Sequence, residues 1–356
     1  MITAQQDPSR LASGAEDLRR DGDSWSRTVN RYARPRLGMS LFSLLTSVVP
    51  FLGLWFLMYL ALDVSYWLTL ALALPTAGFL LRTYILFHDS AHGSLLPSRR
   101  ANDWVGSVLA LISFTPFARW RYEHVAHHST AGDLDRRGLG DVPTLTVAEY
   151  EAMSWRGRFW YRFFRNPFVM FGIGPIYAMI VMPRLAPKKA RPEVQLSVWR
   201  TNLSIVLAVG GLCWLIGWKA FLLVEAPLVP LAGGAGIWLF LVQHQFAGTY
   251  WERSGEWSFA DAALRGSSFL RLPRVLQFFT GNIGFHHVHH LNPRIPNYHL
   301  PRAHDETPVF DGVPRVSLWE GLKSVRLKLW DERLARPVTW ADVRRNRRMQ
   351  PATVRV

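Results

Sequence analysis

Four long apolar segments constrain the fold of this chain more than any other feature. Each has the roughly 20 residues that a helix needs to cross the hydrocarbon core of a bilayer. Residues 62–65 alone separate the first two segments, and a short break near Lys219 separates the last two. The pattern predicts an all-α integral membrane protein with four transmembrane helices in two hairpins. The expected spans are 39–61, 66–87, 198–218 and 221–242.

Two further apolar stretches, at 104–118 and 167–182, are short or interrupted by glycine and proline. Such stretches are more typical of interfacial or re-entrant segments than of spans. If only the two hairpins cross, both termini and the loops between the hairpins share one side of the membrane. The loops carry most of the arginines, which predicts that this side is cytoplasmic.

The charge balance supports a membrane location. Lys and Arg number 41 against 26 Asp and Glu, giving a formal charge of +15. Because the arginines fall mostly in loops between apolar segments, we read them as positive-inside residues of a membrane protein and expect no nucleic-acid partner. The same basic face would attract anionic lipid headgroups or an acidic soluble protein. Cys213 is the only cysteine, so a bound metal must use nitrogen and oxygen ligands.

The polar ends of the chain are expected to be cytoplasmic. Residues 1–38 are Arg-rich without an apolar stretch, unlike a signal peptide. They precede the membrane domain at 39–302, and residues 303–356 follow it. In the C-terminal segment, Ser317 and Glu320 have capping-box spacing, and apolar residues then recur at helical intervals. This predicts an amphipathic helix at about 317–336, on the membrane surface or on the cytoplasmic cap, with disorder from about Arg344.

Three histidine clusters lie beside the apolar segments. Residues spaced i, i+3 and i+4 share one face of a helix, and imidazole is the commonest protein metal ligand. A further histidine emerges where the fourth span ends, at the same expected depth. His287 lies about 100° away from His286 around a helix, and His299 and His304 also fall outside the proposed site. The candidate ligands are His88, His92, His124, His127, His128, His244, His286, His289 and His290.

The number of histidines bears on the metal. One ion cannot use nine ligands, and zinc, which prefers four, would be over-supplied. Two octahedral-tending ions could take four or five histidines each and keep open positions for oxygen or water. Two irons suit oxygen activation better than copper. The Glu-x-x-His motif of soluble di-iron bundles is absent from the clusters.

Other polar residues near the clusters have two readings each. Some carboxylates and an amide are candidates to orient the histidines through their second ring nitrogen, although surface turns are an alternative role. Four arginines are candidates to contact headgroup phosphates, or are solvated interfacial residues. The first set is Glu123, Asp133, Asp135, Asp141 and Asn282, and the second is Arg119, Arg121, Arg136 and Arg137.

The histidine clusters at 88–92, 124–128 and 286–290 resemble the three boxes of the membrane fatty acid desaturases. The segments Thr115–His124, Leu134–Asp141, Trp238–Phe246 and Phe279–His286 are similar to those of bacterial acyl-lipid desaturases of the omega-6 (Δ12) type. The resemblance covers about 36–302. It implies that the eight box histidines and His244 bind two irons. Related acyl-CoA enzymes have Asn where this chain has Phe240, so a tenth, water-mediated ligand is not expected.

The resemblance implies an oxygen-dependent enzyme that introduces a cis double bond into the acyl chain of a membrane lipid. The sequence has no flavin, dinucleotide or haem motif, so electrons would come from a separate ferredoxin or flavodoxin. A di-iron membrane hydroxylase of alkanes, lipids or carotenoids is an alternative within the same chemistry. A metal transporter or sensor is an alternative of another class, although such proteins usually carry ionisable residues inside their spans.

Overall fold

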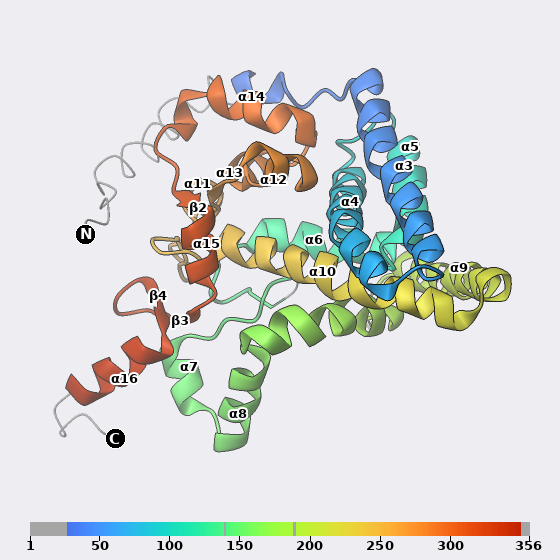
Figure 1. Ribbon diagram of the computed structural model, residues 1–356. Coiled ribbons are helices and arrows are strands. Elements are labelled where there is room, and N and C mark those ends of the chain that lie inside the picture. The colour runs from blue at the N-terminus through green and yellow to red at the C-terminus, as the bar shows by residue number, and fades with distance from the viewer. Residues whose placement is uncertain (1–26, 139, 188–189, 350–356) are drawn as a thin grey trace.

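The computed structural model describes residues 27–138, 140–187 and 190–349. Four of its helices are long and apolar enough to cross a membrane, which confirms the four predicted spans. Within each of the two pairs, α3 with α4 and α9 with α10, a short link joins the spans and the spans pack against each other (Figure 1). The spans are α3 (Leu37–Ala61), α4 (Tyr66–His92), α9 (Pro192–Ile216) and α10 (Trp218–His244).

The two spans that end in histidines are the longest of the four and exceed the length that a bilayer requires. Helices α4 and α10 have 27 residues each, or about 40 Å at 1.5 Å per residue, against a hydrocarbon core of about 30 Å. Their last turns carry His88, His92 and His244. Gly93, at a positive φ of 71°, ends α4. The extra turns therefore place the three histidines beyond the apolar part of each span.

A bent helical segment lies between the two hairpins. It begins with α8 (Trp155–Phe164) and continues, after a bend of 61°, through η1 (Val169–Ile173), η2 (Ile176–Val181) and η3 (Met182–Arg184). His127 and His244, on either side of it in sequence, lie in contact. If α9 and α10, the candidate spans between them, both cross the membrane, a third crossing by the bent segment would put the two histidines on opposite sides. The contact therefore favours a segment that enters and leaves on one side.

The bent segment packs closely on α10 through two glycines. A Cβ atom on Gly234 would lie 2.7 Å from the carbonyl oxygen of Phe171. One on Gly233 would lie 2.7 Å from Cβ of Pro175. Because a backbone carbonyl and a proline ring occupy this space, side chains at these positions would push the bent segment away from α10.

Short elements build a cap over the ends of α4 and α10, on the left and at the top of Figure 1. Strands β1 (Phe269–Arg271) and β2 (Arg315–Ser317) pair in parallel, and β3 (Leu327–Asp331) and β4 (Arg336–Thr339) pair antiparallel. Besides the spans and the bent segment, the described residues contain the helices α5 (Arg99–Ile112), α6 (Phe117–Thr130), α7 (Val147–Ala152), α11 (Phe259–Leu264), α12 (Arg274–Phe279), α13 (His286–Leu291), η4 (Asn297–His299), α14 (Leu300–Asp305), η5 (Pro308–Phe310), α15 (Leu318–Ser324) and α16 (Trp340–Met349).

The prediction of one long C-terminal helix at 317–336 is wrong. The capping box between Ser317 and Glu320 is present, but α15 ends at Ser324 and the chain continues as β3 and β4. Leu329 and Trp330 are buried in the cap, and the Trp330 amide donates to the carbonyl oxygen of Leu145. Strand pairing with distant residues therefore overrides the local helical spacing.

The predictions for the two ends of the chain fall partly outside the described residues. Disorder from about Arg344 is wrong as far as Met349, because α16 is helical to that residue. Residues 1–26 and 350–356 lie outside the described part.

A buried lysine joins the cap to the bent segment. Lys328 of β3 donates from Nζ to the carbonyl oxygen of Arg165, at 2.7 Å, and its own carbonyl oxygen accepts from the Tyr161 hydroxyl at 2.6 Å. Burial, reinforced by the nearby Arg165 guanidinium, lowers the pKa of Lys328 to about 8. The fold thus holds a cation here at an energetic cost.

Candidate metal centre

Nine histidines from four helices meet beneath the cap. They separate into two groups, and within each group one ligand nitrogen per residue lies within 4.8 Å of every other. Helices α4, α6, α10 and α13 each contribute to one group or both. The five-histidine group is His88, His92, His124, His128 and His289, and the four-histidine group is His127, His244, His286 and His290.

The ring nitrogens in each group point at one another. In the four-histidine group, Nε2 of His244 lies 3.0 Å from Nε2 of His127 and 2.9 Å from Nε2 of His286. In the five-histidine group, Nε2 of His128 lies 3.1 Å from that of His124 and 3.0 Å from that of His289. The central nitrogen of each trio carries one proton or one lone pair, so it cannot make a well-directed hydrogen bond with both of its neighbours.

Burial favours the neutral form of five of these imidazoles, all of them on α6 or α13. It lowers the pKa of His124 and His128, and that of His286, His289 and His290, well below the ordinary value, and neighbouring histidines lower it further. A neutral imidazole offers a lone pair, which is the form that binds a metal. The centre is therefore ready for a cation at neutral pH.

Three histidines are fixed through their other ring nitrogen. Nδ1 of His127 lies 2.5 Å from Oδ1 of Asp141, and Nδ1 of His88 lies 3.1 Å from Oδ1 of Asp89. Nδ1 of His244 lies 3.3 Å from the carbonyl oxygen of Gly266. These acceptors favour a proton on Nδ1, which leaves the Nε2 lone pair aimed into the group.

The donor set fits two metal ions. Ligands on opposite sides of an ion, each at about 2.1 Å, lie about 4.2 Å apart, and each group is only slightly wider than that. Nε2 of His92 and Nε2 of His290 are buried without a hydrogen-bond partner, as expected for atoms that await a ligand. All nine donors are imidazole nitrogens, and five exceed the tetrahedral set of zinc.

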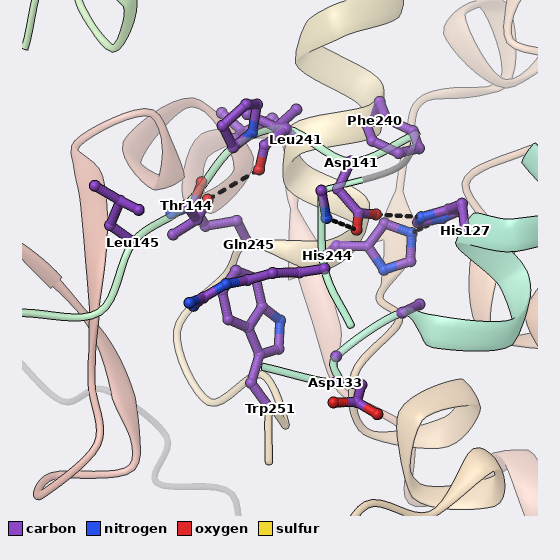
Figure 2. A pocket seen from close by; sticks show the side chains of 16 residues that line it. His127, Asp133, Asp141, Thr144, Leu145, Phe240, Leu241, His244, Gln245 and Trp251 are labelled. Atoms are coloured by element: carbon purple, nitrogen blue, oxygen red, sulfur yellow. Dashed lines mark hydrogen bonds and ion pairs between the residues drawn. The ribbon is translucent and has the colours of Figure 1, made fainter. Parts of the chain in front are cut away.

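A cavity of about 250 Å³ borders the four-histidine group. Figure 2 shows His127 and His244 on one side of it, with Asp141 pointing at His127. Phe240 also lines this wall, and its ring lies 4.9 Å from that of His127 between centroids. The rest of the lining comes from the loop after α6 and the end of α10. The centre therefore opens onto a mainly apolar space.

Comparisons with known proteins agree with this geometry. The family model described as "Fatty acid desaturase" matches residues 65–319. A fatty acid desaturase of Bacillus subtilis is 45% identical over 307 residues, which is 86% of this chain and 87% of that protein. The chain belongs to the fatty acid desaturase family. It is therefore an oxidoreductase of lipid metabolism, and the transporter or sensor alternative is set aside.

Two cyanobacterial desaturases are more distant relatives. The sn-1 oleoyl-lipid 12-desaturase of Synechocystis is 27% identical over 276 residues, covering 74% of this chain and 73% of that protein. The sn-1 acyl-lipid omega-3 desaturase (ferredoxin) of the same organism is 28% identical over 233 residues, or 62% of each. The names of these two relatives give different positions for the double bond, although the two are nearly equally similar to this chain.

The candidate orienting carboxylates of this desaturase have different partners in the structure. Asp141 alone among them contacts a histidine. Glu123 accepts from Arg119 instead, while Asp133 and Asp135 bind the segment at 253–254. The predicted orienting role therefore has a direct contact behind it only for Asp141.

Asp89 is the orienting residue that the sequence analysis missed. Its Oδ2 accepts from the backbone amide and the side chain of Asn297, at 2.9 and 2.8 Å. Asn282 reaches the site only indirectly, by donating to the carbonyl oxygen of Asn297 at 3.0 Å. The signal available in the sequence was adjacency: Asp89 directly follows His88.

The histidines left out of the site lie apart from both groups. His287 is fully buried, with Nε2 2.9 Å from Nδ1 of His304. Neighbouring phenylalanine rings enclose this pair. His299 lines a separate hollow at the surface.

The four arginines considered for headgroup contact all have protein partners. Arg119 is buried and donates to the carbonyl oxygens of Met182 and Leu185, so it ties α6 to the bent segment and does not face the lipid. Arg121 pairs with an aspartate on α5, and Arg136 with Asp133. Arg137 pairs with a glutamate of α7 and also lines the cavity.

Proposed function

We propose that this desaturase is a di-iron enzyme that introduces a cis double bond into the acyl chain of a membrane lipid. The observation that carries the proposal is the pair of buried, all-imidazole groups that open onto an apolar cavity. The balanced reaction is –CH2–CH2– + O2 + 2 e⁻ + 2 H⁺ → –CH=CH– + 2 H2O. Bound iron would supply the oxygen activation and hydrogen removal that side chains alone cannot.

The residues of the two groups would divide the metals between them. The five-histidine group would hold one iron and the four-histidine group the other. Asp89 and Asp141 hold the Nδ1 protons of His88 and His127, one in each group. Fixing the rings in this way keeps each Nε2 lone pair directed at its ion.

The cavity would hold the acyl chain against the four-histidine group. Phe240 and Leu241 line it from α10, and Val142 and Leu145 from the loop after α6. Apolar walls favour the lipid tail and exclude water from the reacting carbons. Arg137 also lines the cavity and would contact a phosphate of the headgroup. The chain residues contribute chiefly by positioning.

The electrons and the membrane location complete the proposal. The reaction needs two electrons from outside, and a chain of charge +15 suits an acidic ferredoxin or flavodoxin. One of the Synechocystis relatives is named as a ferredoxin-linked desaturase. Arginine-rich loops favour a cytoplasmic centre in a bacterial inner membrane. For the double-bond position we retain Δ12 as the hypothesis under test.

Product analysis tests this function. The chain and its His127→Ala variant are expressed in a bacterial host that lacks polyunsaturated lipids, and the double bonds of the extracted fatty acids are mapped by mass spectrometry. We expect a new cis double bond that is absent from the variant, at Δ12 if the regiochemical hypothesis holds. A hydroxylated chain would instead identify the hydroxylase. Unchanged fatty acids in the presence of a functioning donor would contradict the proposal.

A further inference from the structure

A second hollow, of about 350 Å³, lies away from the cavity beside the metal centre. The segment before α3 forms one wall, and η4 and α14 form the other. Figure 1 shows α14 at the top of the molecule, next to the entry into α3. The hollow shares no lining residue with the cavity at the four-histidine group.

Positive charge predominates around the hollow. Arg31, Arg34, Arg36 and Arg302 line it. Glu306 lies among them, paired with Arg31 and Arg302, and the exposed Asp305 is its neighbour in sequence. Four cations against two anions (4 − 2) leave an excess of two positive charges. The side chains of Arg34 and Arg36 are exposed and make no ion pair within the described residues.

A short chain of bonds connects the hollow to a metal ligand. His299 lines the hollow and stands two residues after Asn297 in η4. Asn297 donates twice to Oδ2 of Asp89, at 2.9 and 2.8 Å, and Oδ1 of the same carboxylate lies 3.1 Å from Nδ1 of His88. Asn297 and Asp89 are both buried. Electrons tunnel faster through covalent and hydrogen bonds than across gaps between packed atoms.

We propose that an acidic one-electron carrier protein docks on this hollow and passes electrons to the five-histidine group through Asn297, Asp89 and His88. The inference rests on the proposed function, which requires two external electrons per double bond. Each docking event oxidises one carrier and delivers one electron, and two events with two protons from water complete the balance. Charge complementarity selects the carrier.

In this arrangement the acyl chain and the electron carrier would bind on different sides of the metal centre. The Asp141 side of the centre faces the cavity proposed for the acyl chain, whereas the Asp89 side leads to the basic hollow. A carrier docked on the hollow would therefore leave the cavity open to lipid. Arg36 directly precedes the first span, so anionic headgroups are the competing occupant, and the experiment below separates the two.

The test measures electron delivery to the iron-loaded full chain. The protein is held without oxygen in nanodiscs of zwitterionic phosphatidylcholine, and stopped-flow absorbance follows oxidation of a reduced, acidic [2Fe–2S] ferredoxin. The variant is Arg34→Glu/Arg36→Glu. The matched control is Arg344→Glu/Arg345→Glu, which reverses two exposed arginines on α16, far from α14 in Figure 1. A small uncharged reductant provides a second electron source for every protein.

We expect the second-order rate constant of the Arg34→Glu/Arg36→Glu variant to fall at least about tenfold, with a weaker dependence on salt. The control should stay within about twofold of the wild type, and the uncharged reductant should reduce all three proteins equally. An unchanged rate with ferredoxin would overturn the docking surface. Equal losses with both reductants, or a loss seen only when anionic lipid is added, would also overturn it.

The bonded route has its own variant. Asn297→Pro, which removes both the backbone donor and the side-chain donor to Asp89, should slow the transfer step at saturating ferredoxin at least about tenfold while the encounter rate stays near that of the wild type. Iron content is measured alongside, and Asn297→Ala, which removes the side-chain donor alone and should slow the step less, replaces this variant if Asn297→Pro loses iron. A wild-type transfer rate in the variant that retains iron would refute the route. Normal reduction without a double bond in the wild type would instead count against the proposed function alone.

Discussion

The Asp141 carboxylate lies 2.5 Å from Nδ1 of His127, whose Nε2 lies 3.0 Å from that of His244. The loop after α6 thus orients a histidine that meets the end of α10. Asp89 has the same relation to His88 in the five-histidine group. Each group therefore contains one histidine held from outside by a carboxylate, an arrangement that orients metal ligands and raises their basicity.

Replacing Asp141 by alanine should weaken the four-histidine group. Without the acceptor, the His127 ring loses its fixed orientation, and we expect iron affinity or desaturase activity to fall about 10- to 100-fold. Iron titration of the purified protein and product yield measure the two effects. Asp135→Ala is the control, since this carboxylate in the same loop binds Arg253 and no histidine. Equal behaviour of the two variants would contradict the orienting role.

Filling the cavity should impair binding of the acyl chain without changing the iron content. Val142 lines the cavity but belongs to neither histidine group. We expect Val142→Trp to occupy space needed by the acyl chain and to lower the desaturation rate at least about tenfold, with wild-type iron content. Full activity in this variant would place the acyl chain elsewhere. Val142→Ala, which enlarges the cavity, should retain activity.

The close contact between α10 and the bent segment predicts a stability difference between two glycines. Gly234→Ala would bring a Cβ atom 2.7 Å from the Phe171 carbonyl oxygen, whereas Gly211 in α9 has no neighbour within 4 Å. We expect Gly234→Ala to cost about 1–3 kcal/mol and Gly211→Ala to be neutral or slightly stabilising. Thermal unfolding in detergent compares them, and equal midpoints would argue against the contact.

The buried Lys328 predicts a pH-dependent stability. Its pKa is lowered from 10.5 to about 8 in the folded chain. Between these values the unfolded chain still holds the proton that the folded chain has released, so stability rises with pH across this window. Lys328→Met should remove a rise on the order of 1–2 kcal/mol. The measurement is the difference in thermal unfolding midpoint between the two proteins from pH 7.5 to 10.5. A difference that does not change with pH would contradict the prediction.

The spans were predictable because a bilayer imposes a local rule on the sequence. A stretch such as Leu37–Ala61 must be predominantly apolar and free of charge whatever it packs against. No such local rule governs the secondary structure of the cap. Leu327–Asp331 forms a strand because Arg336–Thr339 and the loop near Leu145 pair with it, and the helical spacing of its leucines could not reveal that pairing.

The sequence predicted which histidines belong to the site, but it did not predict how they divide into two groups. Spacing indicated which histidines share a helical face, but it could not show that His127 joins His244 while the adjacent His128 joins the other group. That division depends on how α6 sits between α4, α10 and α13. Asp89 was missed for the same reason, since its partner Asn297 is more than 200 residues away along the chain.

Iron content per chain tests the central claim most directly. The purified wild type and His244→Ala, which removes one of the four ligands in its group, are loaded anaerobically with iron and analysed by mass spectrometry, with His304→Gln as a control outside both groups. The account predicts two irons in the wild type and the control, and about one in His244→Ala. One iron in the wild type, zinc retained in preference to iron, or two irons in His244→Ala would contradict it.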